Sequence, residues 1–455
     1  MAVLERGHDV ASRSPRRSIR FLSAAAMASS TGDGLASVAF PLLGALVTSD
    51  ARLVAGLYLV QNLPWLLISL PAGAISDRYE PRTVLVLADV VRVASFAVLG
   101  AAIAAWGVPP YWVLALLALV AGTGDTFFHA ASITLLPRLL QDDDLNGANG
   151  RLYAATTLGD QLIGPLLGGV AFAIQRSLPF IANAASFATS ASLLVALPRT
   201  RAKSASAAAA PARPSLAAEL GEAIRFFRTS QLLRTLAGYI ALLAMAQSMV
   251  LSVMVLFARD ELGLGAAQFG AFMAVTSIGN VVGGLVADIT WRRFRGPRLL
   301  VGGGAVMALV FLGVSQLSSP IVAAVALGVE GVVVAALNVG SLTLRQLHTP
   351  DEMRGRVGNL FRTLIYGSAP LGALIAGLVT EAWSTKATLA LAGAVQLVAA
   401  GAAALVLPKA LASAKPASAD DESSESSESS ESSEALPPSQ RDSTVAGDGL
   451  VEVTG

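Results

Sequence analysis

Runs of apolar residues recur along the chain from Phe21 to Leu407, and each is long enough to cross a bilayer as a helix. A hydrocarbon core of roughly 30 Å needs about 20 such residues. Charged residues make up only 14% of the chain and hydrophobic ones 54%, whereas an ordinary soluble domain is roughly 25% charged. The pattern therefore predicts an all-α membrane protein with little soluble structure.

The apolar runs fall into two sets of six, which predicts twelve transmembrane helices in two halves. The predicted helices cover residues 20–46, 53–76, 83–106, 111–137, 147–174, 177–197, 232–258, 265–290, 298–317, 320–345, 355–381 and 386–407. Accordingly, the domains are an N-terminal segment (1–19), a first six-helix half (20–197), a linker (198–231), a second six-helix half (232–407) and a tail (408–455). We expect an amphipathic interfacial helix from Leu216 to Phe227 in the linker, and a disordered Ser/Glu-rich cytoplasmic tail.

Lysine and arginine gather on one side of the predicted helices, and short basic loops remain in the cytoplasm. That side includes Arg13, Arg16, Arg17, Arg20, Arg78, Arg82, Arg138, Arg199, Arg201, Lys203, Arg292, Arg293, Arg295, Arg298, Arg354, Arg356 and Lys409. The other side holds little beyond Arg52, Arg176, Arg259 and Lys386. We therefore expect a multi-pass protein of the cell (inner) membrane with both termini in the cytoplasm.

Composition also excludes several classes of function. A net charge of +1 does not fit a nucleic-acid binder, and the absence of cysteine excludes disulfides, thiolate metal sites and cysteine nucleophiles. The three histidines, His8, His129 and His348, form no recognisable triad or metal cluster. There is no Gly-x-x-x-x-Gly-Lys-Ser/Thr loop for nucleotide phosphates. We expect neither an enzyme nor a cofactor or metal site.

Glycines and acids repeat between the two halves at corresponding positions. Gly73 and Asp77, after the second predicted helix, recur as Gly284 and Asp288 after the eighth. Likewise, Gly164 and Gly169 have counterparts in Gly372 and Gly377. The shared register supports an internal duplication independently of hydropathy.

The stretch PAGAISDRYEPR contains Gly73, Asp77, Arg78 and Arg82 in the spacing of a known loop signature. It resembles the loop between helices 2 and 3 of the major facilitator superfamily, although Glu80 and Pro81 replace a Gly and an Arg of that pattern. Gly73 would allow close helix approach, and Asp77 could pair with a base or sit at a helix N-terminus. Such contacts would stabilise one conformation of a rocking transporter.

A Gly-Pro run in predicted helix 5, Gly164, Pro165, Gly168 and Gly169, resembles the signature of the superfamily's exporters. Small residues permit tight packing, and proline releases a backbone hydrogen bond that can bend the helix. Gly159 is one residue out of register with the usual pattern. The alternative interpretation of this run is a purely structural kink.

The longer stretch from Gly122 to Gly169 is similar to one subgroup of the superfamily, which includes enterobactin-type siderophore exporters and macrolide efflux proteins. It includes Gly124-Asp125-Thr126-Phe127-Phe128, Leu136-Pro137 and the Leu145–Gly150 loop. The resemblance implies the major facilitator fold, alternating access driven by a proton gradient, and export of small amphipathic molecules by a monomer. Helix 4 lacks the buried arginine of many drug antiporters, so any proton coupling must use other groups.

Ionised side chains inside membrane helices are costly and usually face a cavity or a partner. The candidates for proton coupling are Asp33, Asp125, His129, Asp160 and Glu330. Asp33 ranks first because it lies in mid-span with no basic residue within one turn. Asp125 and His129 lie at i and i+4 on one helix face and could share a proton. Each of these could instead be a structural packing group.

Two further pairs of charged residues have structural interpretations. Asp89 and Arg92, at i and i+3, are expected to neutralise each other. Arg151 and Arg362 begin helices 5 and 11 and are interpreted as membrane anchors.

The candidates for contact with an amphipathic substrate are amides and one aromatic side chain. They are Gln61, Asn62, Trp65, Gln161, Gln247 and Asn338. Each could instead be a hydrogen-bonding contact between helices. Two other functions remain open: uptake of a nutrient by the same fold, and a transporter-like membrane sensor that binds a ligand without moving it.

Overall fold

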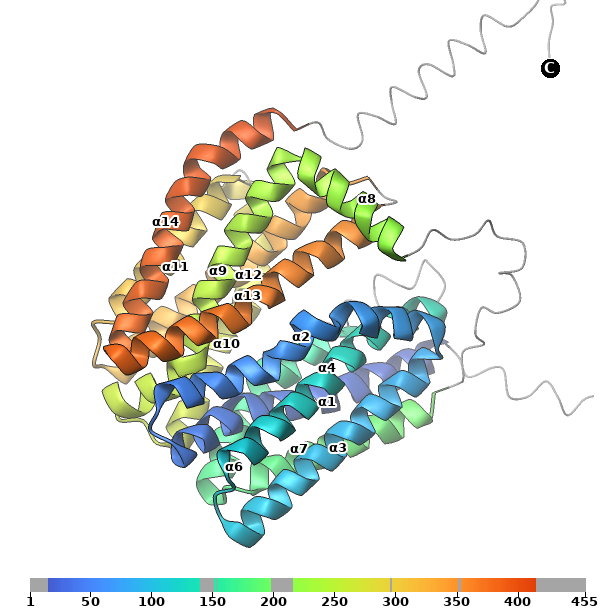
Figure 1. Ribbon diagram of the computed structural model, residues 1–455, viewed down its shortest axis with the longest axis vertical. Coiled ribbons are helices and arrows are strands. Elements are labelled where there is room, and N and C mark those ends of the chain that lie inside the picture. Colours follow the sequence, from blue (N-terminus) through green and yellow to red (C-terminus); the bar gives the residue numbers. More distant parts are fainter. Residues whose placement is uncertain are drawn as a thin grey trace, which may run out of the picture.

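The computed structural model describes residues 15–139, 151–152, 154–197, 216–294, 297–350 and 353–414, and within these ranges it is helical and contains no strand. The first bundle comprises α1 (Pro15–Val47), α2 (Ala51–Arg78), α3 (Pro81–Trp106), α4 (Tyr111–Leu139), the π-helix η2 (Leu158–Ile163), α6 (Gly164–Ile174) and α7 (Leu178–Val195). The second comprises α9 (Gln231–Leu256), the π-helix η3 (Phe257–Glu261), α10 (Ala266–Arg293), α11 (Pro297–Val314), α12 (Pro320–Leu347), α13 (Arg354–Ala382) and α14 (Thr385–Ala412). Figure 1 shows these two bundles with α8 (Leu216–Thr229) lying across one end of the second.

Eleven of the described helices are long and apolar enough to cross a membrane, and α11, apolar over Arg298–Val314, is a shorter one. Together they account for the predicted arrangement of two six-helix halves. Helices are favoured in lipid because they satisfy every backbone donor and acceptor within the segment. Large apolar side chains such as Leu67, Leu285 and Ile321 remain well exposed in the isolated chain, as expected of a surface that lipid covers. Residues 408–412 of the predicted tail continue α14, and the tail from residue 415 onwards lies outside the described residues.

The ends of the helices carry the residues that the physics of helix termini favours. Asp50 accepts a hydrogen bond from the Arg52 amide at the start of α2, and Ser230 and Ser384 cap α9 and α14 in the same way. Proline stands in the first turn of α3, α7 and α12, where its missing N–H costs nothing. α8 is strongly amphipathic, and its Phe227 packs edge-on against Phe361 of α13.

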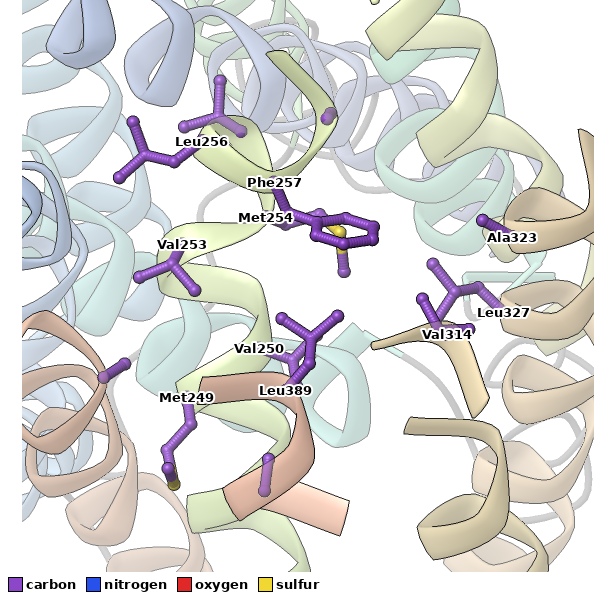
Figure 2. Close-up of a cluster of buried hydrophobic side chains, with 14 of the residues drawn as sticks. Met249, Val250, Val253, Met254, Leu256, Phe257, Val314, Ala323, Leu327 and Leu389 are labelled. Atoms are coloured by element: carbon purple, nitrogen blue, oxygen red, sulfur yellow. The ribbon is translucent and has the colours of Figure 1, made fainter. Parts of the chain in front are cut away.

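Among the described residues, the two bundles share a buried apolar cluster at one end of the molecule. At the end opposite α8, one cluster combines Val38 of α1 and Val54 of α2 with residues of the second bundle, several of which Figure 2 shows around Phe257 and Met254. At the end that carries α8, the buried clusters are separate, one built around Leu22 and Leu135 and the other around Leu236 and Phe361. Figure 1 shows the bundles drawing together away from α8.

Candidate functional site

The side chain of Arg92, on α3, is only 1% exposed and is the cation at the centre of a cluster of carboxylates in the first bundle. Its guanidinium lies 2.5 Å from Asp89 of the same helix, 3.4 Å from Asp33 of α1 and 3.8 Å from Asp125 of α4. It also donates a hydrogen bond to Ser29. The expected pairing of Asp89 and Arg92 is present, but the pair extends to two further helices.

Aromatic rings hold the guanidinium of Arg92 in place. Its carbon lies 4.5 Å from the ring centre of Phe128 and 4.2 Å from that of Phe187. A cation over an aromatic face is attracted to the ring, more strongly where water is excluded. The charge of Arg92 is therefore fixed in position, whereas Asp33 and Asp125 keep 35% and 39% of their side-chain surface accessible.

The candidates for proton coupling divide between the two bundles. Asp33 and Asp125 meet at Arg92, and Asp160 lies close enough to both to act on them electrostatically. Glu330 is instead buried in the second bundle, where Gln247 lies close enough to act on it. The first bundle thus brings three of the four candidate carboxylates close together, and two of them pair with Arg92.

The predicted contact between Asp125 and His129 is mediated by a third residue. Asp125 accepts a hydrogen bond from the indole Nε1 of Trp65 at 3.1 Å, and the His129 ring packs against the same indole with centroids 5.1 Å apart. No ion pair joins Asp125 to His129 in the described part of the chain. Both residues do lie on one face of α4, but Trp65 of α2 contacts each of them.

The remaining substrate-contact candidates are scattered. Asn62 bonds back to the Tyr58 carbonyl of its own helix, and the Gln61 carbonyl packs on Gly122 of α4. The side-chain oxygens of Gln161 and Gln247 are buried without a hydrogen-bond partner among the described residues, while Asn338 is exposed. Trp65 is thus the one of these six candidates that contacts the carboxylate cluster.

The π-helix η2 explains why Gly159 is out of register. Pro165 has no N–H to donate one turn back, and the Gly164 N–H bonds to the Gly159 carbonyl five residues earlier, so the turn accommodates one extra residue. Both glycines consequently face α1: a Cβ on Gly159 would lie 2.9 Å from the Met27 oxygen, and one on Gly164 would lie 2.5 Å from the Gly34 Cα. The π-helical turn therefore places both glycines on the helix face that packs on α1, although their spacing in the sequence does not predict this.

The Gly-Pro run packs on two different helices. Gly168 faces Leu35 of α1, where a Cβ would lie 2.7 Å from the backbone oxygen, and Gly169 faces Gly270 of α10 in the other bundle at the same 2.7 Å. These contacts bring the backbones of α1, α6 and α10 together next to Asp33. The run therefore follows a π-helical turn within its own span and also contacts the second half.

Replacing Gly34 with alanine should destabilise the protein, because the new Cβ would lie 2.5 Å from the Asp160 oxygen and 2.9 Å from the Gly164 Cα. Backbone atoms cannot move aside cheaply, so we expect a loss of about 1–3 kcal/mol. The melting temperature of the detergent-purified protein measures this. Gly73→Ala is the matched control, since nothing lies within 4 Å of its Cβ position; equal melting temperatures for both variants would contradict the packing argument.

The glycines of the loop signature do not make the close helix contact that the sequence predicts. No atom lies within 4 Å of a Cβ built on Gly73 or Gly284, so neither glycine provides close helix approach in this conformation. Arg82 instead donates to the Leu194 carbonyl at 3.0 Å and to the Val195 carbonyl, capping the C-terminus of α7. The side chains of Asp77 and Asp288 lie outside the described residues, whereas Arg78 is described and exposed.

The sequence interpretation missed three residues of the site. The i, i+3 spacing pairs Arg92 with Asp89 alone, although the cost of burying a mid-span arginine is a signal that it contacts several helices. Tyr366 of α13 stacks on Trp65 with centroids 4.5 Å apart, and its direct chain neighbours, Ile365 and Gly367, gave no sign of a site. Arg362, interpreted as an anchor, lies near enough to act electrostatically on both His129 and Tyr366.

At the end opposite α8, charged side chains of the second bundle cap helix ends of the first. Arg259 of η3 donates to the Ala45 carbonyl near the C-terminus of α1 at 2.8 Å. Glu381 of α13 accepts from the Ala51 amide at the N-terminus of α2 at 3.2 Å. Cations at helix C-termini and anions at N-termini are both favourable. We name Arg259 and Glu381, with these two contacts, the outer latch.

Comparison with known proteins agrees with this arrangement. Residues 13–438 match the family model described as "Transmembrane secretion effector". The chain is 28% identical to the "Multidrug efflux pump Tap" of Mycolicibacterium fortuitum over 404 residues, covering 85% of this chain and 94% of that protein. It is also 28% identical to the "Enterobactin exporter EntS" of Citrobacter koseri, covering 76% and 81% respectively.

Among solved structures, the fold is similar to that of the nucleoside transporter NupG, in its D323A mutant. The TM-score is 0.70 at 14% identity, with 86% of this chain and 100% of that chain covered. A bacterial homologue of the iron transporter ferroportin, solved in an inward-facing state, gives a TM-score of 0.64 at 17% identity, with 88% and 99% covered.

Proposed function

The chain belongs to the transmembrane secretion effector family of the major facilitator superfamily, and on that premise we propose that it exports small amphipathic organic molecules in exchange for protons. The candidate substrates are drugs, secondary metabolites and siderophores. In this proposal the protein spans the cell (inner) membrane with both termini in the cytoplasm. The relatives named for multidrug efflux and enterobactin export support the outward direction of transport.

The distribution of basic residues supports the proposed orientation. At the end that carries α8, the described side chains include the exposed Arg78, Arg293 and Arg298, whereas few basic residues occupy the opposite end. Since short basic loops remain in the cytoplasm, the end with α8 is the cytoplasmic one. The shared core and the outer latch then close the outer end, so this conformation faces inward.

The observation that carries the proposal is the imbalance of charge around Arg92. Three carboxylates, Asp33, Asp89 and Asp125, lie within 4.0 Å of a single guanidinium. With all three ionised, the group carries excess negative charge, which a proton or a cationic substrate can neutralise. Asp89 is fully buried against Arg92, so the exchangeable positions are the accessible Asp33 and Asp125.

The coupling step follows because protons and the Arg92 guanidinium compete for those carboxylates. A proton arriving from outside neutralises Asp33, which weakens its attraction to Arg92 and lets α1 move relative to α3. Release of that proton to the cytoplasm restores the ion pair. Because α1 packs through glycines against η2 and α6, and α6 contacts α10, a shift of α1 reaches the second bundle.

The outer latch should stabilise the conformation that is closed at the outer end relative to the one that is open there. Arg259→Ala removes a charge-assisted hydrogen bond that joins the halves, and at this partly exposed position we expect a loss of about 1 kcal/mol, or roughly fivefold in the conformational equilibrium. Because the chain has no cysteine, Leu42→Cys gives a single labelling site beside Arg259 in an apolar cavity between the halves. Labelling by an impermeant maleimide from outside should rise about fivefold.

Arg176→Ala is the matched control, because Arg176 lies in the exposed turn between α6 and α7 at the same end of the molecule. Its labelling rate should equal that of the parent. Unchanged labelling in Arg259→Ala would show that the outer latch does not hold the halves together.

The Asp50–Arg52 pair beside the outer latch should persist over a wide range of pH. Hydrogen bonding from Arg52 lowers the pKa of Asp50 to about 2, and Arg52 in turn approaches Glu381 at 4.0 Å. A depressed pKa stabilises the fold above the ordinary pKa of aspartate, and that contribution is lost only as the pH falls towards 2. The Asp50–Arg52 pair thus remains ionised at any pH at which the transporter operates.

The experiment that tests the proposed function compares accumulation of drugs and siderophores in cells with and without the gene, in the presence and absence of an uncoupler. An exporter lowers accumulation, and the uncoupler abolishes the difference. A nutrient importer would raise accumulation instead. A membrane sensor would bind ligand without changing its distribution across sealed vesicles.

A further inference from the structure

Trp65 and Tyr366 form a stack of aromatic rings between the two bundles. Their centroids lie 4.5 Å apart with the planes inclined by 22°, whereas the His129 ring approaches the indole at 5.1 Å and 60°. Trp65 comes from α2 and Tyr366 from α13, so the stack joins the first bundle to the second.

The Trp65–Tyr366 stack is one of several contacts between α2 and α13 that join the halves. From the outer side, these contacts run through Ala51 and Gly377 to Leu66 and Gly367, which neighbour the two rings. Tyr366 itself is 39% exposed. Because the buried clusters of the two bundles are separate at the end that carries α8, we expect a cytoplasmic molecule to reach the stack from that side.

The orientation of the indole is fixed by the carboxylate cluster. Its Nε1 donates to Asp125 at 3.1 Å, which sets the indole edge against a carboxylate that also neighbours Arg92. The ring face is left for stacking. A planar molecule on that face would have the accessible carboxylate of Asp125 at its edge, within reach of a cationic substituent.

We propose that the indole face of Trp65 is the stacking platform for planar aromatic cations, and that Tyr366 occupies the platform when no substrate is bound. The inference rests on the proposed export function, whose substrate class it specifies. Stacked aromatic pairs change an equilibrium constant by only a fewfold to about tenfold, so an incoming fused ring can displace Tyr366. Displacement removes one aromatic contact between α13 and α2.

The test uses two permanent cations of different shape: ethidium, which is planar, and tetraphenylphosphonium, whose rings are not coplanar. In Trp65→Leu we expect ethidium efflux and equilibrium binding to weaken about tenfold, while tetraphenylphosphonium changes less than about twofold. Trp65→Phe, which keeps a ring but loses the hydrogen bond to Asp125, should fall between Trp65→Leu and the parent. Trp106→Leu, an exposed tryptophan at the outer end, is the matched control and should match the parent.

The variant Tyr366→Leu should change ethidium binding in the opposite direction. Removing the ring that competes for the platform should tighten ethidium binding by a fewfold, measured with the purified protein by quenching of tryptophan fluorescence. Tyr366→Phe should behave as the parent, because the stack uses the ring and not the hydroxyl. Weaker ethidium binding in Tyr366→Leu would overturn the displacement step.

The outcomes also separate this inference from the proposed function. If the parent extrudes both cations and Trp65→Leu loses both equally, the stacking platform is wrong and export stands. If the parent binds tetraphenylphosphonium but not ethidium, the platform is also wrong. If the parent moves neither cation nor any tested drug or siderophore in an uncoupler-sensitive manner, the export function itself fails.

Discussion

Asp33→Asn is expected to abolish uncoupler-sensitive efflux and bring substrate accumulation to the level of cells without the gene. Asparagine keeps the shape of the side chain but cannot bind or release a proton, so it cannot alternate between a neutral form and an ion pair with Arg92 at 3.4 Å. Because the Asp33 side chain is 35% exposed and Arg92 retains Asp89, the fold and the membrane expression should be preserved.

Two measurements distinguish lost coupling from lost folding or lost binding. Exchange of labelled for unlabelled substrate across proteoliposomes needs no proton gradient and should survive in Asp33→Asn. Asp50→Asn is the matched control at a carboxylate outside the cluster, where asparagine also serves as an N-cap, and its efflux should equal that of the parent. Uncoupler-sensitive efflux by Asp33→Asn would remove Asp33 from the coupling mechanism.

The fold could be predicted from sequence because lipid constrains each segment separately. An apolar run of sufficient length becomes a helix whatever its neighbours are, so hydropathy located the spans. The internal duplication, seen in Gly164 and Gly372, supplied the grouping into halves. The apolar stretch of α11 is shorter than those of its neighbours. Hydropathy therefore identifies it as a membrane span less clearly than the others.

The site was harder to predict because it depends on how helices are rotated about their axes. Asp33 had no basic residue near it in sequence, yet Arg92 reaches it from α3. Helix 4 lacks a buried arginine, and α3 supplies one next to Asp125 instead. Similarly, the i, i+4 spacing of Asp125 and His129 identified a shared face but could not show that Trp65 of another helix would contact both.

Neutralising Arg92 alone should cause the largest loss of stability of any single change considered. In Arg92→Gln, the carboxylate of Asp89, whose side chain is fully buried, would remain without a counterion. Removing one partner of a buried pair costs about 3–5 kcal/mol, and the Phe128 and Phe187 rings would lose the cation that they hold. We expect poor membrane expression and a melting temperature well below that of the parent.

The double variant Asp89→Asn/Arg92→Gln separates structure from coupling. With both charges gone, no buried ion is left uncompensated, and replacing both members of a buried pair is often neutral, so expression and melting temperature should recover most of the loss. Efflux should not recover, because Asp33 and Asp125 would then repel each other with no cation between them. Recovery of efflux together with stability would mean that Arg92 only neutralises Asp89. A double variant as unstable as Arg92→Gln would show instead that the guanidinium's contacts with the two aromatic rings, and not its charge, hold α3 in place.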